Sequence, residues 1–374
     1  MLHSEKQRNE KSMQTLHIFN PEHDMALAYN DELFTPPHAG RAMRADLSFL
    51  PIFWSEDGDV IVVDDVDQAL EKIRHFKRKL PQVTFITVNK LPSLAGRDID
   101  IDVWGWDSSI RHTLLRKGLK NKKLPTDEAL RRLREISHRQ WGAEILSCVR
   151  QDTELTIGEA ELVTTIEAIN NKLAQGGAWV LKAPWSCSGR GVRYVEKELS
   201  QQIRSWMAKI IHQQGGIMME PKYNKVKDFG MEFYSDGKGN ITYKGLSLFQ
   251  TANGAYAGNL LATEDDKIEI LQQYLSIERL GEITEKLIKC FSTRLRNIYK
   301  GPLGVDMMIV ASAGNRQPCL LHPCVEVNLR RTMGHVALSL APTPFDPQQL
   351  MRITYDGHYH LKISNIQTNN SIDK

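Results

Sequence analysis

The sequence predicts a mixed α/β and α+β fold, in which an N-terminal, Rossmann-like domain with a parallel sheet precedes a region of antiparallel sheets. In the first third of the chain, short apolar runs alternate with amphipathic helical patterns, which is typical of βαβ units. After Ala178, apolar runs follow one another with tight turns between them, as they do in antiparallel sheets. The 374 residues, of which 41% are hydrophobic, provide enough material for two or three domains with buried cores.

The first domain is predicted from its alternation of strands and helices. Residues 14–19, 59–63, 84–88 and 100–104 are rich in valine, isoleucine and aromatic side chains and are predicted to be strands. Residues 66–78 and 108–117 have apolar side chains at helical spacing. Because helical segments separate these strands, the strands are expected to pair in parallel.

The second region begins with helical patterns and continues with clustered strands. The helical patterns cover residues 127–148 and 158–173, and a longer one over 267–297 is expected to break near Gly281. The predicted strands are 180–183, 193–195, 217–221, 229–235, 241–251, 256–262, 303–311 and 319–329. Asp236-Gly237 and Asn253-Gly254 occupy hairpin positions, which favours antiparallel pairing. Residues 365–374 form a polar tail that is expected to fray.

The composition argues against several classes of protein. A formal net charge of +3 is too small to indicate a nucleic-acid partner, and no apolar run approaches the ~20 residues that a membrane-spanning helix needs. Residues 1–12 are polar, lack the apolar core of a signal peptide, and are expected to be a disordered lead. The five cysteines are sparse and odd in number, as expected for free thiols. We therefore expect a cytoplasmic protein.

A phosphate site is indicated by the stretch AWVLKAPWSCSGRGVRYV, residues 178–195. Lys182 lies near the end of an apolar strand, where a buried ammonium needs an anionic partner. The small side chains that follow would let backbone N–H groups approach that anion closely. The loop is neither a Walker A motif nor a dinucleotide fingerprint. An ordinary hairpin with a snorkelling lysine remains the alternative interpretation.

A metal site is indicated by two later strands. Asp306 interrupts the apolar run GPLGVDMMIV, and Glu326 and Asn328 stand two residues apart in PCVEVNLRR. Residues two apart point to the same face of a strand. Three oxygen-bearing side chains on apolar strands suit Mg²⁺, with room for phosphate oxygens. The alternative is a buried Asp306 that pairs with Arg330 or Arg331.

A third element lies between these two, in IMMEPKYNKVKDFGMEFY, residues 217–234. One strand ends at Glu220, and a short polar connection leads to a new strand at Asp228. Such a crossing can offer backbone hydrogen-bonding groups to an adenine and a carboxylate to a ribose. When this segment is taken alone, an ordinary strand pair with polar ends is the preferred interpretation.

Taken in order, these segments resemble the ATP-grasp superfamily, which includes D-alanine–D-alanine ligase, biotin carboxylase and glutathione synthetase. VLKAPWSCSGRGV, MMEPKY with DFGMEFY, and GVDMMIV with VEVNLRR carry the resemblance, which covers about residues 137–334. It implies a two-subdomain ATP-grasp fold with antiparallel sheets, after an N-terminal α/β domain of the pre-ATP-grasp kind. The expected divisions are a lead (1–12), an N-terminal domain (13–135), an ATP-grasp domain (136–345) and a C-terminal segment with a polar tail (346–374).

The resemblance also implies roles for individual residues. It places Lys182 on the α- and β-phosphates, Asp228 near the ribose, and Glu220 with Lys222 or Tyr223 near the adenine. It assigns one or two Mg²⁺ ions to Asp306, Glu326 and Asn328. The loop expected to close over the triphosphate contains Ser186, Ser188, Gly189, Arg190 and Gly191. Arg139 stands where many members have a further nucleotide-contacting lysine, and arginine still binds phosphate.

The chemistry that the resemblance implies is ATP-dependent ligation. A substrate carboxylate would form an acyl phosphate, and an amine would then displace the phosphate to give an amide. Lys182 and one of Arg330 and Arg331 are the expected catalytic residues, because phosphoryl transfer needs charge neutralisation more than a protein nucleophile. ATP and Mg²⁺ are the expected cofactors, and Mn²⁺ can replace Mg²⁺. A kinase that phosphorylates a small molecule and a non-catalytic ATP sensor are the alternatives.

The substrates are expected to be small-molecule or peptide carboxylates and amines, and the pattern is compatible with a homodimer. Two segments contain candidate substrate contacts. In FNPEHDMALA these are Asn20, Glu22, His23 and Asp24, which follow the first strand, where open α/β sheets bind ligands. Asp24 could equally cap a helix that begins at Met25. In FQTANGAYAGNLLA the candidates are Tyr256 and Asn259, although a plain Asn-Gly hairpin explains that segment as well.

Overall fold

The N-terminal domain contains the parallel sheet that the sequence predicts. The computed structural model describes residues 13–119, 123–186, 191–196, 199–252, 255–312 and 318–366. The strands of the first sheet are β1 (Thr15–Ile18), β2 (Val60–Val62), β3 (Thr84–Ile86) and β4 (Asp100–Val103). They run parallel in the order β3-β2-β1-β4, which confirms the Rossmann-like arrangement.

Helices cover this sheet and connect its strands. They are α1 (His23–Tyr29), α2 (His38–Leu47), α3 (Val66–Arg74) and α4 (Ser108–Arg116), with 3-10 segments η1 (Leu50–Phe53) and η2 (Val88–Leu94). Asp65 and Asp107 cap α3 and α4, because each side chain accepts a hydrogen bond from a backbone N–H in the first turn. Leu16, Val60 and Val103 lie in the core between the sheet and η2.

Two helices lead into the second part of the chain. α5 (Asp127–Ile136) and α6 (Arg139–Arg150) replace the single helical stretch predicted over 127–148. The break falls at Ser137 and His138, where the His138 ring accepts a hydrogen bond from the first turn of α6. Arg139 therefore begins α6, next to the strands that follow.

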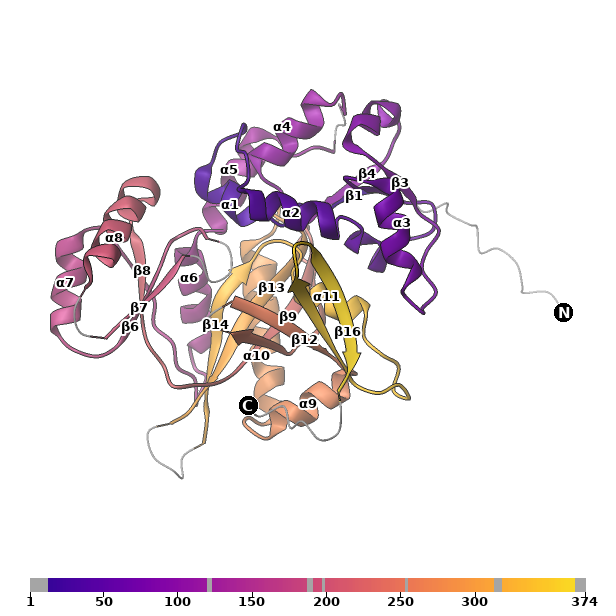
Figure 1. Cartoon of the computed structure of the whole chain (residues 1–374). Coiled ribbons are helices and arrows are strands. Elements are labelled where there is room, and N and C mark those ends of the chain that lie inside the picture. Colours follow the sequence, from indigo (N-terminus) through magenta and orange to yellow (C-terminus); the bar gives the residue numbers. More distant parts are fainter. Residues whose placement is uncertain are drawn as a thin grey trace.

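A small subdomain follows, built on an antiparallel sheet. Its strands are β5 (Glu161–Val163), β6 (Trp179–Lys182), β7 (Val192–Val195) and β8 (Ile217–Pro221), in the order β5-β8-β6-β7. α7 (Ile166–Ala174) and α8 (Gln201–Gln214) pack on it around Ile169, Leu181 and Met207. Figure 1 shows this subdomain at the left of the molecule, beside the central sheet and apart from the indigo N-terminal domain.

The central sheet is the largest part of the core. It contains β9 (Lys225–Asp236), β10 (Ile241–Ser247), β13 (Lys300–Val310) and β14 (Leu320–Asn328), in the order β10-β9-β13-β14. α9 (Glu264–Gln272) and α10 (Ile277–Arg294), together with α6, pack on one face around Phe229, Phe233 and Phe291. No helix in the described part of the chain is both long and apolar enough to cross a membrane.

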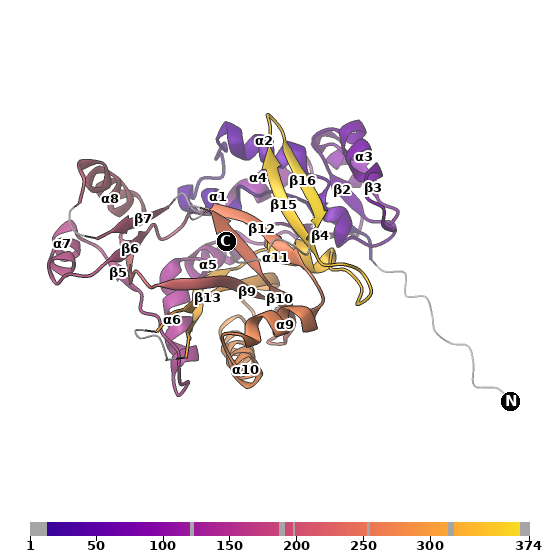
Figure 2. The same ribbon diagram turned by 60° about the horizontal axis from the view of Figure 1, so that its bottom comes forward.

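A fourth sheet joins the C-terminal segment to the middle of the chain. Its strands are β11 (Phe249–Ala252), β12 (Ala255–Leu261), β15 (Gln349–Tyr355) and β16 (Tyr359–Asn365), in that order. Met351 on β15 shares a core with Leu50 of the N-terminal domain and with Val336 of α11 (Met333–Ser339). Figure 2 shows β15 and β16 beside the N-terminal domain. Residues 349–365 are therefore an integral part of the sheet that contains β12.

Several predicted elements differ from the structure. The helix predicted over 158–173 begins at Ile166, because residues 161–163 pair with β8 as strand β5. The break in 267–297 falls at 273–276, where Ser276 caps α10, and Gly281 lies inside that helix. The strand predicted over 241–251 is divided between β10 and β11. Helices α8 and α11 and the hairpin β15–β16 were not predicted. The Asn253-Gly254 turn lies outside the described residues.

Asp102 at the end of β4 joins the N-terminal domain to the segment after β14. Its Oδ2 accepts a hydrogen bond of 3.0 Å from Arg331 and another of 3.0 Å from the Trp54 indole. The same oxygen lies 2.9 Å from Nδ1 of His17. The Arg331 guanidinium also lies over the Trp54 ring, 4.3 Å from its centre. Burial by itself would raise the pKa of Asp102, but Arg331 and the bond from His17 lower that pKa to about 2.

Asp102→Asn is expected to destabilise the protein by about 2 kcal/mol at neutral pH. The folded pKa lies below the unfolded one, so this stabilisation is fully present above about pH 4 and is lost as the pH falls toward 2. Denaturant unfolding of both proteins at neutral pH and near pH 3 should show a difference that shrinks by roughly half at the lower pH. Exposed Asp67→Asn is the control, and a difference that is independent of pH would contradict the prediction.

Candidate active site

A cavity of about 520 Å³ lies between the small subdomain, the central sheet and the β11–β12 strands. Most of the predicted site residues line it, although they come from distant parts of the chain. Those residues are Arg139, Lys182, Glu220, Lys222, Tyr223, Asp228, Tyr256, Asn259, Asp306, Glu326, Asn328 and Arg330. The structure thus places these side chains around one space, while their individual roles stay predictions.

The strand register arranges the predicted metal ligands in two adjacent rows. Residues directly opposite each other on neighbouring strands share a face of the sheet. One row contains Gly230, Asp306 and Glu326, and the next contains Glu232, Gly304 and Asn328. A glycine in each row leaves room for the neighbouring side chains: a Cβ at position 304 would lie 2.6 Å from Glu232 Oε2, and one at position 230 would lie 3.7 Å from Asp306 Oδ1. The sheet face opposite α10 therefore has acidic and polar side chains, and α11 and β11 cover part of it.

The carboxylates on this face are close enough to affect one another. Burial first, and then the carboxylates of Glu326 and Glu232, raise the pKa of Asp306 to about 8. The Asn328 amide donates a 3.3 Å hydrogen bond to Asp306 Oδ2. A divalent cation would relieve this repulsion, and two carboxylates with an amide oxygen are a donor set suited to Mg²⁺.

The donor set is incomplete by itself. In the described part of the chain, no three His, Cys, Asp or Glu side chains are grouped so that they could hold a metal ion alone. Phosphate oxygens of a nucleotide would supply the remaining ligands, as Mg²⁺ sites commonly require. The residues therefore fit a magnesium ion that arrives with a nucleotide better than a permanent structural metal.

Lys182 has an anionic partner within the protein. Its Nζ lies 2.5 Å from Oε2 of Glu220, and both residues are 7% exposed. β6 and β8 are antiparallel, with Val180 opposite Glu220, which makes Lys182 and Glu220 diagonal neighbours at the cavity wall. The Glu220 carboxylate thus already neutralises the positive charge of buried Lys182. A bound phosphate would have to interact with this lysine alongside Glu220.

Arg139 connects the small subdomain to the metal-ligand row. Its guanidinium donates to the Ala183 carbonyl at 2.7 Å, to Ser186 Oγ at 2.9 Å and to Glu326 at 2.8 Å. Its buried Nε has no hydrogen-bond partner in the described structure. The Arg139 guanidinium thus bridges Ser186, at the start of the predicted phosphate loop, and the Glu326 carboxylate. This position is compatible with the phosphate contact predicted for Arg139.

The residues predicted near adenine and ribose line the side of the cavity next to the small subdomain. Lys222 pairs with Glu196 at 2.5 Å, and its backbone N–H donates to the Ala178 carbonyl. Asp228 accepts hydrogen bonds from Lys225 at 2.5 Å and from Thr251 at 2.8 Å. Burial raises the pKa of Tyr223 to about 12, so its hydroxyl keeps its proton and can donate.

The two arginines after β14 lie in different places. Arg330 lines the cavity and forms a bidentate ion pair with Asp24, in which the two hydrogen bonds are 2.8 Å and 2.7 Å long. Burial would lower the pKa of Arg330, but the Asp24 carboxylate raises it. Arg331 is held by Asp102 and Trp54 and does not line this cavity. The geometry brings Arg330, and not Arg331, to the candidate site.

Comparison with solved structures identifies the fold. A biotin carboxylase–βγ-ATP complex from Campylobacter jejuni matches 91% of this chain and 76% of its own, with 13% identity and a TM-score of 0.52. A Rhizobium etli pyruvate carboxylase matches 91% of this chain and 31% of its own, with 14% identity and a TM-score of 0.53. The chain has the ATP-grasp fold. No family model and no curated protein matches its sequence.

In this ATP-grasp fold, the loop that is predicted to bind phosphate connects β6 to β7. Ser188, Gly189 and Arg190 lie outside the described residues, whereas Ser186 and Gly191 are described. The Gly191 carbonyl accepts a 2.8 Å hydrogen bond from the Ala183 backbone N–H. A Cβ at position 191 would lie 2.3 Å from Ser186 Oγ, so only glycine lets the two ends of the loop meet.

The N-terminal motif is mostly occupied with internal contacts. The Asn20 amide donates to the Gly105 carbonyl at 2.8 Å, and Glu22 pairs with Arg44. His23 lies 3.0 Å from Asp107, and these three motif residues do not line the ATP-grasp cavity. Asp24 does not cap its helix, because α1 begins one residue earlier, at His23. Instead, Asp24 holds Arg330 from across the domain boundary.

Sequence reasoning missed several residues that line the ATP-grasp cavity. Glu232, Ser247, Thr332 and Gly334 all contribute to its wall. Glu232 carried a usable signal, because it follows Asp228 by four residues in a strand and therefore lies on the same face. The others depend on how α11 and β10 meet, which no local pattern reveals.

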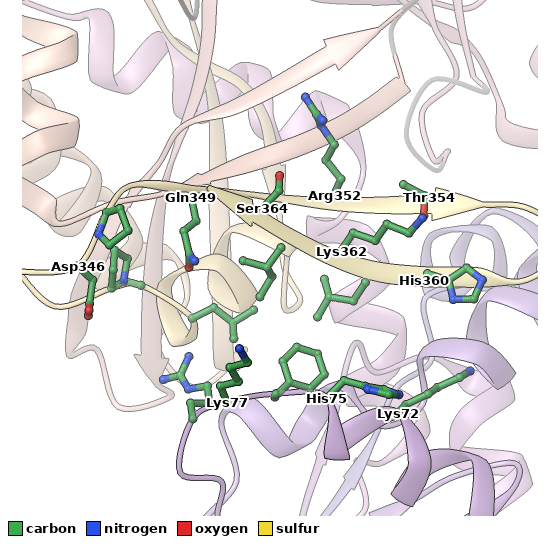
Figure 3. A pocket seen from close by; sticks show the side chains of 18 of the residues that line it. Lys72, His75, Lys77, Asp346, Gln349, Arg352, Thr354, His360, Lys362 and Ser364 are labelled. Atoms are coloured by element: carbon green, nitrogen blue, oxygen red, sulfur yellow. The ribbon is translucent and has the colours of Figure 1, made fainter. Parts of the chain in front are cut away.

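A second cavity of about 1000 Å³ lies away from this site, between the end of α3 and the β15–β16 hairpin. Figure 3 shows Lys72, His75 and Lys77 on one side and the hairpin side chains on the other. None of the predicted site residues lines it. The smaller cavity, which is lined by both acidic and basic side chains, therefore remains the candidate active site of the ATP-grasp fold.

Proposed function

We propose that the protein is an ATP-dependent ligase that activates a substrate carboxylate as an acyl phosphate and joins it to an amine. Mg-ATP would bind between the small subdomain and the central sheet. The observation that carries this proposal is the two-row array of acidic and polar side chains on the central sheet, which lines one cavity together with Lys182 and Arg139. Acidic groups on one side and cations on the other suit a metal-bound triphosphate.

The residues around the cavity can perform the reaction by neutralising and positioning charge. Bound Mg²⁺, held by Asp306, Glu326 and Asn328, would supply Lewis-acid stabilisation of the phosphates. Lys182 and Arg139 would bind phosphate oxygens, and Arg330 would face the carboxylate substrate or the transferring phosphoryl group. No side chain has to form a covalent bond, because preorganised charge supplies most of the catalysis.

The atoms balance in two steps. A carboxylate oxygen attacks the γ-phosphorus, and the bond to the bridging oxygen breaks, which releases ADP. The amine nitrogen then attacks the acyl carbon, and the carbon–oxygen bond breaks as inorganic phosphate leaves. The nitrogen loses one proton as it becomes an amide. The solved biotin carboxylase with the same fold, described as a βγ-ATP complex, supports the nucleotide part of this proposal.

Hydroxylamine trapping is the experiment that tests the proposed function. The full-length protein is incubated with Mg-ATP, hydroxylamine and a panel of carboxylic acids, amino acids and short peptides. A ligase will form a hydroxamate with at least one carboxylate, and ADP will accumulate in equal amount. A stable phosphorylated product would instead identify a kinase, and nucleotide binding without any turnover would identify a sensor.

A further inference from the structure

The second cavity, between the end of α3 and the β15–β16 hairpin, is lined mostly by positive charge. Its volume is about 1000 Å³, and among the described side chains that line it, Asp346 is the one carboxylate. The cations that line it are Lys72, Lys77, Arg78, Arg352 and Lys362. The whole chain, in contrast, has 48 Lys and Arg residues against 45 Asp and Glu residues. This space, called the basic cavity below, is therefore a local excess of positive charge in a nearly neutral protein.

Three of these cations have no partner among the described residues. Lys77, Arg78 and Arg352 take part in no hydrogen bond or ion pair there. Asp346 forms no ion pair with them, and instead its carboxylate accepts hydrogen bonds of 3.0 Å and 2.7 Å from the backbone N–H and the hydroxyl of Thr343. A cavity whose cations are unpaired attracts anions and raises their local concentration.

The cations come from two parts of the chain that meet across the basic cavity. Lys77 and Arg78 follow α3 in the N-terminal domain, whereas Arg352 and Lys362 stand directly opposite each other on β15 and β16. Figure 3 shows Lys77 on one side and the hairpin with Arg352 and Lys362 on the other. Like charges at directly opposite positions of an antiparallel pair are destabilising. A bound anion would offset this repulsion and connect the hairpin to the N-terminal domain.

Strand β16 adds backbone hydrogen-bond donors to the basic cavity. β16 is the last strand of its sheet in the described part of the chain, and Leu361 and Ile363 line the cavity. The Tyr359 N–H donates to the Asp46 carboxylate at 2.8 Å, so it points away from β15. Because N–H groups in an antiparallel strand alternate in direction, those of Leu361 and Ile363 also point away from β15. They can donate to the oxygens of a bound anion.

Aromatic and aliphatic side chains form the rest of the wall. Phe49 and Phe76 line the basic cavity with their ring centres 6.2 Å apart, and Leu340 and Tyr359 line it as well. Sites for small organic ligands typically have volumes of about 300–1,000 Å³ and combine apolar walls with a few polar or charged groups. The basic cavity therefore has the size and the lining of a site for an organic anion, and it is larger than a single phosphate requires.

We propose that the basic cavity binds a small organic polyanion, with two or more phosphate or carboxylate groups, at a site separate from the candidate active site. Lys77 and Arg78 would bind one anionic group and Lys362 another, since both kinds of group accept charge-assisted hydrogen bonds from Lys and Arg. The apolar part of the ligand would lie against Phe76. This inference does not depend on the proposed ligase function, because none of the predicted site residues lines the basic cavity.

Two probes of different chemistry test the proposal by calorimetric titration of the full-length protein in EDTA. Tripolyphosphate presents phosphates, and benzene-1,3,5-tricarboxylate presents carboxylates on a ring. At least one is expected to bind, and Lys77→Glu with Arg78→Glu is expected to raise its Kd at least about 10-fold, because attraction becomes repulsion. The control, Lys209→Glu with Lys289→Glu, makes the same change in net charge at exposed positions of α8 and α10. It should change the Kd less than about threefold.

Three results would overturn the proposal. They are no binding of either probe at millimolar concentration, equal weakening in both double variants, and binding that Lys182→Met with Glu220→Gln abolishes, which would place the probe in the candidate active site. Hydrogen–deuterium exchange locates the bound probe independently. Slower exchange in residues 75–80 and 359–366 would support the proposal, and protection confined to other segments would contradict it. A failure to form hydroxamates would reject the ligase proposal and leave these results unchanged.

Discussion

Asp306→Asn is expected to abolish ATP turnover, with kcat reduced by at least about 10²- to 10³-fold. Asp306 lies at the centre of the row that contains Glu326. The substitution removes the Asp306 carboxylate, whose pKa is raised by burial and by the nearby carboxylates of Glu326 and Glu232. Removing that charge weakens the hold on a divalent cation and on the phosphates that the cation carries. Steady-state ADP release with saturating Mg-ATP measures the effect, and Glu285→Gln, on the exposed face of α10, serves as the control.

The same variant is expected to be at least as stable as the wild type without nucleotide or metal. Because the folded pKa of Asp306 is about 8, the folded state holds an extra proton between about pH 4 and 8. Wild-type stability therefore declines as the pH rises through this range, and Asp306→Asn removes that decline. Thermal unfolding between pH 5 and about pH 9 checks the sign. A variant that unfolds earlier at every pH would indicate a structural role for Asp306 instead.

Lys182→Met is expected to destabilise the small subdomain by about 3–5 kcal/mol and to abolish nucleotide binding. The substitution leaves the Glu220 carboxylate buried without its 2.5 Å partner, and breaking one side of a buried ion pair costs this much. A non-hydrolysable ATP analogue, titrated by calorimetry, measures the binding. Lys209→Met, on the exposed face of α8, is the matched control.

The double variant Lys182→Met with Glu220→Gln separates the two roles of the lysine. It is expected to recover most of the lost stability, because no buried charge remains unpaired. It is not expected to recover nucleotide affinity, since the cation that would meet the phosphates is still missing. Recovery of both would show that Lys182 serves only to neutralise Glu220.

Much of the fold could be predicted because local patterns match the final pairing. Strand β8 coincides with its predicted bounds, and the alternation in residues 14–104 led to the parallel sheet. The failures have a common physical cause. Residues 161–163 form a strand only because β8 lies beside them, and β15 depends on β12. Tertiary pairing, and not intrinsic preference, determines such elements.

The site was predictable where residues two apart in one strand must share a face. Glu326 and Asn328 followed from this rule, and the register adds Asp306 to the same surface. Contacts between remote segments could not be predicted in this way. Asp24 meets Arg330 across 306 positions, and Lys182 meets Glu220 only because β6 lies between β8 and β7. Glu232 was within reach of the alternation rule, although it was not singled out.

The pairing of β12 with β15 has a consequence for protein synthesis. Asn259, in the cavity wall, lies on a strand whose second neighbour begins only at Gln349, after all the predicted metal ligands. A ribosome must therefore synthesise β15 before this wall is secured. A nascent polypeptide that has passed Asn328 but has not reached Gln349 would contain Lys182 and every predicted metal ligand, yet it is not expected to consume nucleotide.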